Sequence, residues 1–212
     1  IALGLFESDE EVKNSPKQIG DVRAGDIKYK DLNGDGVIDS YDQAPIGYGD
    51  VPEILYGFGF TLGYKNFSLS TLFQGAANVD YLLSGEGIMP FQQGMARGNL
   101  FSNIENRWSE ENPNPNAFYP RLASGNINDN FASSTWWVKN ANYLRLKTIQ
   151  VNYNLPKAWV SKLKLSSASI FVQGTNLLTF SPFELWDVEL GNGRGARYPN
   201  TATYNAGLAV SF

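Results

Sequence analysis

The stretch that decides the fold is Gly25–Tyr64, GDIKYKDLNGDGVIDSYDQAPIGYGDVPEILYGFGFTLGY. In its second part, large apolar residues alternate with small ones: the even positions are Ile54, Tyr56, Phe58, Phe60, Leu62 and Tyr64, and the odd positions are Leu55, Gly57, Gly59, Thr61 and Gly63. A period of two places the large side chains on one face of a β-strand. This segment of eleven residues is about as long as a tilted strand must be to cross a bilayer. We therefore predict a membrane-type strand over residues 54–64.

The first part of the same stretch has the spacing of a calcium-binding loop. Oxygen ligands are expected at loop positions one, three, five, seven, nine and twelve, with a glycine at the sharp turn, here Gly36. The predicted ligands are Asp31, Asn33, Asp35, Val37 through its carbonyl, Asp39 and Asp42. The last position departs from the glutamate of an EF-hand, and no amphipathic helices flank the loop. We expect a structural Ca²⁺ that rigidifies the loop; the alternative is a solvated turn rich in Asp, Asn and Gly.

Composition excludes several classes of function. The chain has 212 residues, a net charge of −4, and neither cysteine nor histidine. Disulfides, thiol nucleophiles, Ser-His triads and zinc sites built on His or Cys are therefore excluded, and no basic surface favours nucleic acid. The chain opens with IALGLFESDE, without a start methionine or a signal peptide. We expect it to be a piece of a longer protein.

Alternation recurs along the chain. A two-residue turn at 65–66 connects residues 54–64 to a second alternating segment at 67–79, which predicts a hairpin. Alternation resumes at Trp136 and continues to residue 155, but the apolar positions change from even to odd between Lys147 and Ile149. This change predicts a β-bulge or a strand that leaves the membrane there. Further strands are predicted from Ala168 and over 203–212.

The lengths of the connections indicate the architecture. Long connections at 7–53, 80–135 and 181–199 alternate with short ones at 65–66 and 156–166. This order places every long loop on one side of the sheet, as in an outer-membrane barrel. The predicted parts are a strand end and extracellular acidic loop (1–53), a transmembrane hairpin (54–79), a long extracellular loop with a short helix at 100–108 (80–135), two transmembrane strands with a periplasmic turn (136–180), an extracellular loop (181–199) and a closing strand (200–212).

In several stretches the chain resembles the C-terminal end of the SusC/RagA-type TonB-linked outer-membrane transporters, within the TonB-dependent receptor family. These stretches are the 25–80 segment, ENRWSEENPNPNAFYPRL, NANYLRLKTIQVNYNLPKAW, FVQGTNLLTFSPFELWDVELG and YNAGLAVSF. The resemblance covers essentially the whole chain. It implies an all-β fold: the C-terminal five strands, and the end of a sixth, of a large antiparallel transmembrane β-barrel of about 22 strands with a plugged lumen.

The resemblance also implies a function and partners. Such proteins import large nutrients across the cell outer membrane, chiefly oligosaccharides and in some members peptides. They act with a SusD-like surface lipoprotein, the remainder of the barrel and plug, and TonB, whose contact region lies in a missing N-terminal part. The final Phe212 resembles the signal read by the barrel-assembly machinery; alternatively, it anchors the strand end in the membrane interface.

Four residues are candidate substrate contacts. Trp136 and Trp137 either line the substrate path or belong to the aromatic girdle of a barrel. Arg194 and Arg197 lie in a glycine-rich loop, where they contact substrate or lid, or are simply solvated.

Two other functions are alternatives for such a sequence. A calcium-stabilised soluble β domain that binds carbohydrate is the alternative, but it leaves the one-sided long loops unexplained. A glycosidase needs two paired carboxylates, whereas Asp187 and Glu189 are expected to be solvated in a loop. Enzymatic activity is therefore not predicted. Arg145 and Lys147, on the polar side of a strand, are expected to face the lumen and the plug.

Overall fold

The computed structural model describes residues 1–85, 87–90, 100–123, 129–191, 193–195 and 197–212. The chain forms two compact units. Unit 1 comprises Ile1–Asp50, Asp80–Lys139 and Asn192–Ala196, and unit 2 comprises Val51–Val79, Asn140–Gly191 and Arg197–Phe212. Within the described residues, no helix has both the length and the apolar character to span a membrane.

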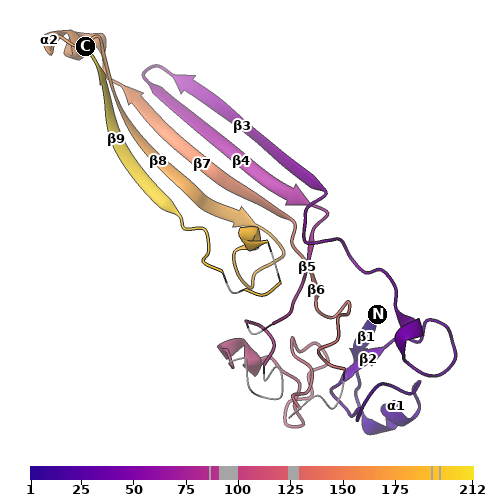
Figure 1. The fold of residues 1–212 in the computed structure, drawn as a ribbon. Helices are drawn as coiled ribbons and strands as arrows, with labels where there is room; N and C mark the ends of the chain where they lie inside the picture. Colours follow the sequence, from indigo (N-terminus) through magenta and orange to yellow (C-terminus); the bar gives the residue numbers. More distant parts are fainter. Residues whose placement is uncertain (86, 91–99, 124–128, 192, 196) are drawn as a thin grey trace. The chain divides into compact units, whose positions relative to one another are not determined.

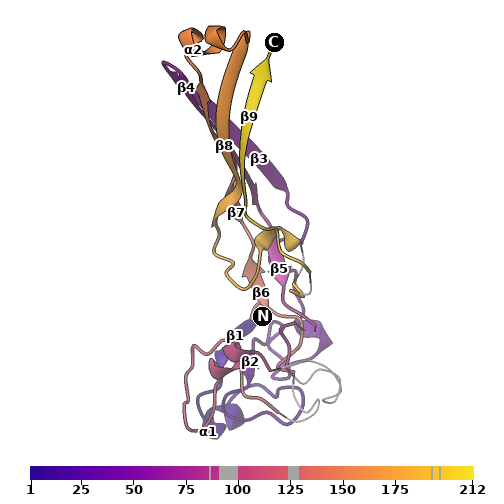
Figure 2. The same ribbon diagram turned by 90° about the vertical axis from the view of Figure 1, so that its left-hand side faces the viewer.

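Unit 2 is built on a single antiparallel sheet of five strands (Figure 1). The strands, in spatial order, are β3 (Ile54–Tyr64), β4 (Phe67–Ala77), β7 (Tyr143–Asn154), β8 (Ser167–Phe180) and β9 (Thr203–Ser211). Figure 2 views the same sheet from the side, as one curved layer. The strands occupy the alternating segments of the sequence, and each pair of neighbouring strands is antiparallel.

The strand register gives this sheet one polar and one apolar face. One row across all five strands reads Thr61, Ser70, Gln150, Gln173 and Asn205. The next row, on the opposite face, reads Leu62, Leu69, Val151, Val172 and Ala206. On the apolar face the rings of Phe58 and Phe73 stack with centroids 5.1 Å apart. Many large side chains of that face, among them Phe58, Leu62 and Val172, are exposed in the described chain, whereas a water-soluble sheet buries such a face.

A β-bulge in β7 keeps these faces consistent. Leu146 pairs with Phe73 of β4, and Thr148 pairs with the adjacent Leu72, so Lys147 is an extra residue. The pairing of β7 with β8 is irregular at the same place. The bulge predicted from the change of parity is therefore present. The residues of β7 on the polar face have odd numbers before the bulge and even numbers after it.

The connection between β7 and β8 contains a helix, α2 (Lys157–Lys162), where the sequence predicted only a turn. The helix ends in a Schellman motif, because the amide of Leu165 donates to the carbonyl of Val160 and the amide of Lys164 donates to that of Ser161. Lys164 occupies the left-handed position of this motif with φ +57°. Six residues give too few turns for a clear 3.6-residue pattern, which explains why the sequence did not reveal the helix.

Unit 1 contains short elements joined by long loops. They are β1 (Ala2–Leu5), α1 (Asp9–Lys13), β2 (Ile27–Tyr29), the 3₁₀ helix η1 (Ser40–Asp42), β5 (Asp80–Leu82) and the 3₁₀ helix η2 (Ser102–Glu105); β5 pairs with β6 (Val138–Asn140). β1 pairs with β2, which makes a separate two-stranded sheet in this unit. That residues 1–6 are the end of an earlier strand of the wall stays a prediction. The short helix expected at 100–108 is the four-residue η2, because Asn and Ser compete for backbone hydrogen bonds.

Aromatic rings and one buried carboxylate hold unit 1 together. Trp137 is 1% exposed and lies at 6.1 Å, centroid to centroid, from the ring of Tyr119. Asp26 is buried, and its two oxygens accept hydrogen bonds from the guanidinium of Arg121 at 3.0 and 2.8 Å. The side-chain amide of Asn130 donates to the same carboxylate. These contacts join the N-terminal segment to residues more than ninety positions away.

Candidate functional site

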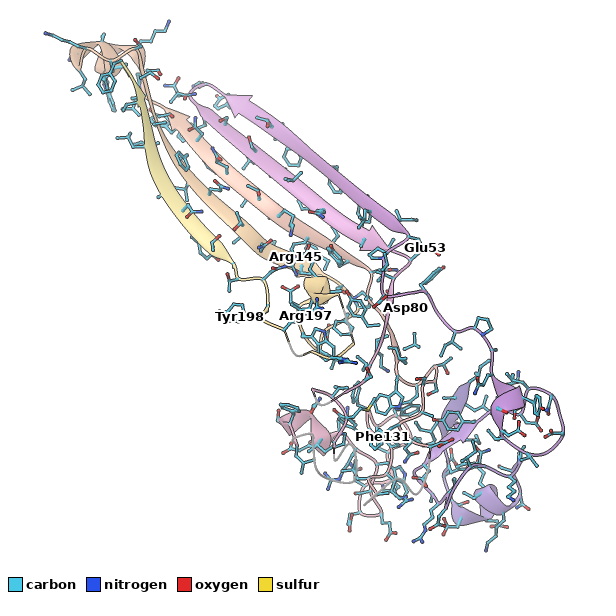
Figure 3. The ribbon with its side chains drawn as sticks, in the orientation of Figure 1. Glu53, Asp80, Phe131, Arg145, Arg197 and Tyr198 are labelled. Carbon is cyan, nitrogen blue, oxygen red and sulfur yellow. The ribbon has the colours of Figure 1, made fainter. Side chains whose placement is uncertain are left out.

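An ion-pair cluster in unit 2 joins the polar face of β7 to the loop between β8 and β9. The loop residues Asp187 and Glu189 flank the start of the 3₁₀ helix η3 (Val188–Leu190). Arg145 Nη2 lies 2.6 Å from Asp187 Oδ1, and Arg145 Nη1 lies 2.9 Å from Glu189 Oε2. Lys147, the bulged residue, places Nζ 2.9 Å from Glu189 Oε2. Figure 3 shows Arg145 beside this loop.

Further hydrogen bonds complete the cluster. The hydroxyl of Tyr143 and the side-chain amide of Asn200 both donate to Glu189, at 3.1 and 2.7 Å. Backbone amides of Glu189 and Asn200 donate to Asp187. Burial raises the pKa of Asp187, but the hydrogen bonds from Arg145 and the Glu189 amide outweigh it, so that the pKa lies below its usual value. Two cationic side chains of β7 therefore pair with two carboxylates of the loop and hold the loop against the strand.

This cluster corrects one expectation. Asp187 and Glu189 were expected to be solvated, but their side chains are only 9% and 11% exposed and both are ion-paired. Arg145 and Lys147, expected to face the lumen and the plug, lie on the polar side of β7 and bind a loop of the same chain; their contact with the plug stays a prediction. A signal was present in the sequence: the two bases are two residues apart, and so are the two acids. Residues two apart in a strand lie on the same face, so both bases face the loop together.

The two arginines predicted to contact substrate have different surroundings. Arg194 lines an open cavity of about 370 Å³ in unit 1, together with Tyr48, Asp50, Asp80 and Ser84. That volume is at the lower end of the range for small-molecule sites. Arg197, in unit 2, donates from Nη1 to the carbonyl of Leu190 at 3.0 Å and so closes the η3 turn.

The aromatic candidates also differ in their surroundings. Trp137 lies in the core of unit 1, with Nε1 donating to the carbonyl of Asn130 at 2.8 Å. Trp136 is partly buried, and its Nε1 donates to the carbonyl of Phe118 at 3.2 Å. Phe212 follows the last residue of β9 and is 92% exposed. Its role as an assembly signal stays a prediction.

The predicted calcium loop is an ordered turn stabilised by its own carboxylates. Asp31 accepts hydrogen bonds from the amides of Gly34 and Gly36, at 2.6 and 2.8 Å. Asp42 is buried and accepts from the amides of Leu32 and Asp39, at 2.7 and 2.8 Å. Hydrogen bonds from Asp39 and Leu32 hold the pKa of Asp42 below its usual value.

The donor types and spacing of this loop suit Ca²⁺, since each carboxylate oxygen that accepts one amide retains a second lone pair. Among the described residues, however, no three acidic, His or Cys side chains converge closely enough to hold an ion. The turn therefore stays folded through amide-to-carboxylate bonds in this arrangement. Calcium binding stays a prediction.

Known proteins with similar sequences are TonB-dependent receptors. The chain is 33% identical to TonB-dependent receptor P26 of Formosa agariphila over 99% of its length, and 28% identical to receptor P3 of the same organism. It is 25% identical over 87% of its length to TonB-dependent receptor SusC of Bacteroides thetaiotaomicron. The chain spans about a fifth of these relatives, namely 22%, 21% and 17%. No family model matches the chain.

The fold is that of part of a solved receptor. The RagAB peptide importer in the "open-open" state matches the whole chain with a TM-score of 0.69 and 23% identity, over 22% of its own chain. The "closed-closed" state gives a TM-score of 0.67 and 21% identity. The all-β antiparallel sheet with two unlike faces agrees with this match. The chain accordingly belongs to the TonB-dependent receptors of the SusC/RagA type, and its five-stranded sheet is a section of their barrel wall.

Proposed function

We propose that this chain forms part of the wall and outer loops of an outer-membrane importer of large nutrients. Oligosaccharides are the principal substrate class in this proposal, and peptides are the second. The importer works with a SusD-like surface lipoprotein, with the remainder of the barrel and its plug, and with TonB as the energy source. The observation that carries the proposal is the sheet with one apolar and one polar face across all five strands.

The dimensions of the apolar face support a membrane position. Tyr56 and Tyr64 of β3 are eight residues apart on this face. At ~3.4 Å per residue they are separated by about 27 Å along the strand, and by about 21 Å along the membrane normal at the usual tilt of ~40°. That height is close to the apolar band of about 25 Å in outer-membrane barrels.

The polar face supports a water-filled or plug-filled interior. Its central row carries hydroxyl and amide side chains from every strand, including Thr61 and Ser70, whose hydroxyl oxygens lie 3.0 Å apart. The ion-pair cluster holds Asp187 and Glu189 against β7 on this face, so this part of the connection between β8 and β9 lies on the lumen side of the wall. Transport follows from movement of the plug, which this wall surrounds. Phe212 then serves the barrel-assembly machinery.

The cavity in unit 1 supports contact with a polar nutrient. Tyr48 offers a hydroxyl and an aromatic ring, Asp80 a carboxylate, and Arg194 a guanidinium. Such groups bind sugar hydroxyls as well as the backbone and termini of peptides. Peptides are the second class because the structurally similar RagAB is a peptide importer.

The other functions receive less support. The similar proteins are receptors and importers rather than enzymes, and the acid pair that a glycosidase would need is neutralised by Arg145 and Lys147. A soluble carbohydrate-binding domain would leave the apolar face of the sheet in water, at a large cost in free energy.

The test uses the intact receptor in its native cell envelope. A strain that lacks the receptor gene is complemented with the wild type, with Arg194→Ala or with Arg23→Ala, a control at an exposed surface arginine. Uptake of fluorescent oligosaccharide and peptide pools is measured. We expect uptake of one pool to require the receptor and to fall with Arg194→Ala but not with Arg23→Ala. Unchanged uptake of both pools in the deletion strain, or recovery of the intact protein in the soluble fraction, would overturn the proposal.

A further inference from the structure

We infer that the short-turn end of the five-stranded sheet binds the phosphate groups of anionic phospholipids. This surface, called here the lysine end, consists of the β3–β4 turn and the segment around α2. The inference rests on the proposed function, because it requires the sheet to stand in a membrane. In Figure 1 the β3–β4 turn, α2 and the C terminus lie at the same end of the sheet.

Charge is segregated within unit 2. Four lysines occupy the lysine end, all exposed: Lys65, Lys157, Lys162 and Lys164. The acidic residues of unit 2 are Glu53, Glu184, Asp187 and Glu189, and all four lie in connections at the opposite ends of the strands. The lysine end therefore carries positive charge with no acidic side chain of the sheet's own unit beside it, and an anionic partner is complementary to it.

Two of these lysines stand where the backbone favours another residue. Lys65 has φ +53° in the hairpin turn, and Lys164 has φ +57° at the end of α2. Glycine or asparagine is the usual residue at such left-handed positions, because a side chain strains them. The backbone conformation of neither turn favours lysine over glycine or asparagine. Lysine at two such positions therefore indicates that the side chain has a function of its own.

Apolar side chains mark the depth of this end in a membrane. Tyr64, Phe67 and Tyr153 form one row on the apolar face, with the rings of Phe67 and Tyr153 4.6 Å apart. Aromatic rows of this kind lie at the level where hydrocarbon meets headgroups. The lysines come directly after this row, so their ammonium groups reach the phosphate layer; Lys65 Nζ lies 5.2 Å from the ring centre of Tyr64.

The helix α2 has an exposed apolar side as well as its lysines. Trp159 is 60% exposed and Leu163 is 65% exposed, and the two are four residues apart, on the same side of the helix. Val160 is buried and fixes the helix to the unit. A short helix with an exposed Trp and Leu between lysines suits a lipid surface, where the rings enter the acyl boundary and the cations bind phosphate.

The experiment uses the intact receptor in nanodiscs of phosphatidylcholine with increasing phosphatidylglycerol, and native mass spectrometry counts the lipids retained. The variant is Lys157→Gln/Lys162→Gln/Lys164→Gly. The control is Lys13→Gln/Lys17→Gln/Lys30→Gln in unit 1, which removes the same number of charges elsewhere. Because the glycine relieves the left-handed strain at residue 164, loss of lipid binding in the variant cannot be ascribed to a weakened helix.

We expect the wild type and the control to prefer phosphatidylglycerol by at least about tenfold, and the variant to lose most of that preference. An equal preference in variant and wild type would overturn the inference. Retention of lipid A phosphates, lost in the variant, would overturn it as well, since it would assign this end to the other leaflet. A receptor that does not enter the nanodisc would instead reject the proposed function, so the two failures are distinguishable.

Discussion

Replacing Arg145 with methionine should release the loop between β8 and β9 from the wall of the sheet. Methionine approximates the length of the arginine stem but removes the charge and the fork of donors. Arg145 is 3% exposed, and it contacts both Asp187, at 2.6 Å, and Glu189, at 2.9 Å. In the variant, Glu189 retains Lys147 at 2.9 Å. Asp187 keeps the hydrogen bonds from the backbone amides of Glu189 and Asn200 but loses its cation, and it becomes a poorly compensated buried charge.

The expected loss of loop stability depends on the difference between the two carboxylates, because Glu189 keeps a cation and Asp187 does not. Removing one partner of a buried ion pair costs roughly 3–5 kcal/mol. The low end applies here, since one of the two carboxylates keeps its cation and both are slightly exposed. About 3 kcal/mol corresponds to roughly a hundredfold increase in the opening equilibrium of the loop.

Hydrogen exchange of the intact receptor in detergent measures this opening directly, in peptides covering residues 181–200. Arg23→Met is the matched control, because Arg23 pairs with Asp21 on an exposed surface, where water screens the pair and little stability is lost with it. The double variant Arg145→Met/Asp187→Asn removes the stranded charge and should recover part of the protection. Loop exchange in Arg145→Met within about threefold of the wild type would refute the reasoning.

Three more outcomes are expected. The pKa of Asp187 is lowered in the folded loop, so the ionised carboxylate stabilises the loop fully above the usual pKa of 3.8, and this stability is lost as the pH falls through the lower folded value. Hydrogen-exchange protection of the loop, corrected for the intrinsic exchange rate, should therefore hold from about pH 7 to about pH 4 and then fall. The Asp187→Asn variant should lack this transition. Asp26→Ala leaves Arg121 without its buried carboxylate and should destabilise unit 1 by about 3–5 kcal/mol, seen as a lower thermal midpoint, while Asp21→Ala should not. Calorimetry should detect Ca²⁺ binding that Asp35→Asn weakens at least tenfold, and an absence of binding heat in the wild type would remove the calcium assignment.

Alternation along the chain predicted much of the sheet, because a period of two is a local property. Residues 54–64 form a strand of the predicted length. The change of parity near Lys147 also located the bulge, since an extra residue exchanges the odd and even positions that share a face.

The loop cluster and the short elements depended on partners far along the chain. Arg145 and Asp187 are 42 residues apart, and no local pattern says that they meet. Residues 2–5 form a strand only because Ile27–Tyr29 lies beside them. By sequence alone, Trp137 fits either an aromatic girdle or a substrate path. The burial of its side chain in unit 1 depends on the rings of Tyr119 and Phe131, which lie beside it.

The extra residue in β7 separates two halves of the strand whose odd and even residue numbers are exchanged between the two faces of the sheet. Deletion of Lys147 would place Leu146 directly before Thr148, and their partners Phe73 and Leu72 are already adjacent. The strand would then be regular, and every other side chain of β7 would keep its face. The loss would be confined to the ammonium group that pairs with Glu189. Deletion of a regularly paired residue of β7 would instead move the side chains on one side of it to the opposite face, so the bulge is the position of this strand at which a change of length is best tolerated.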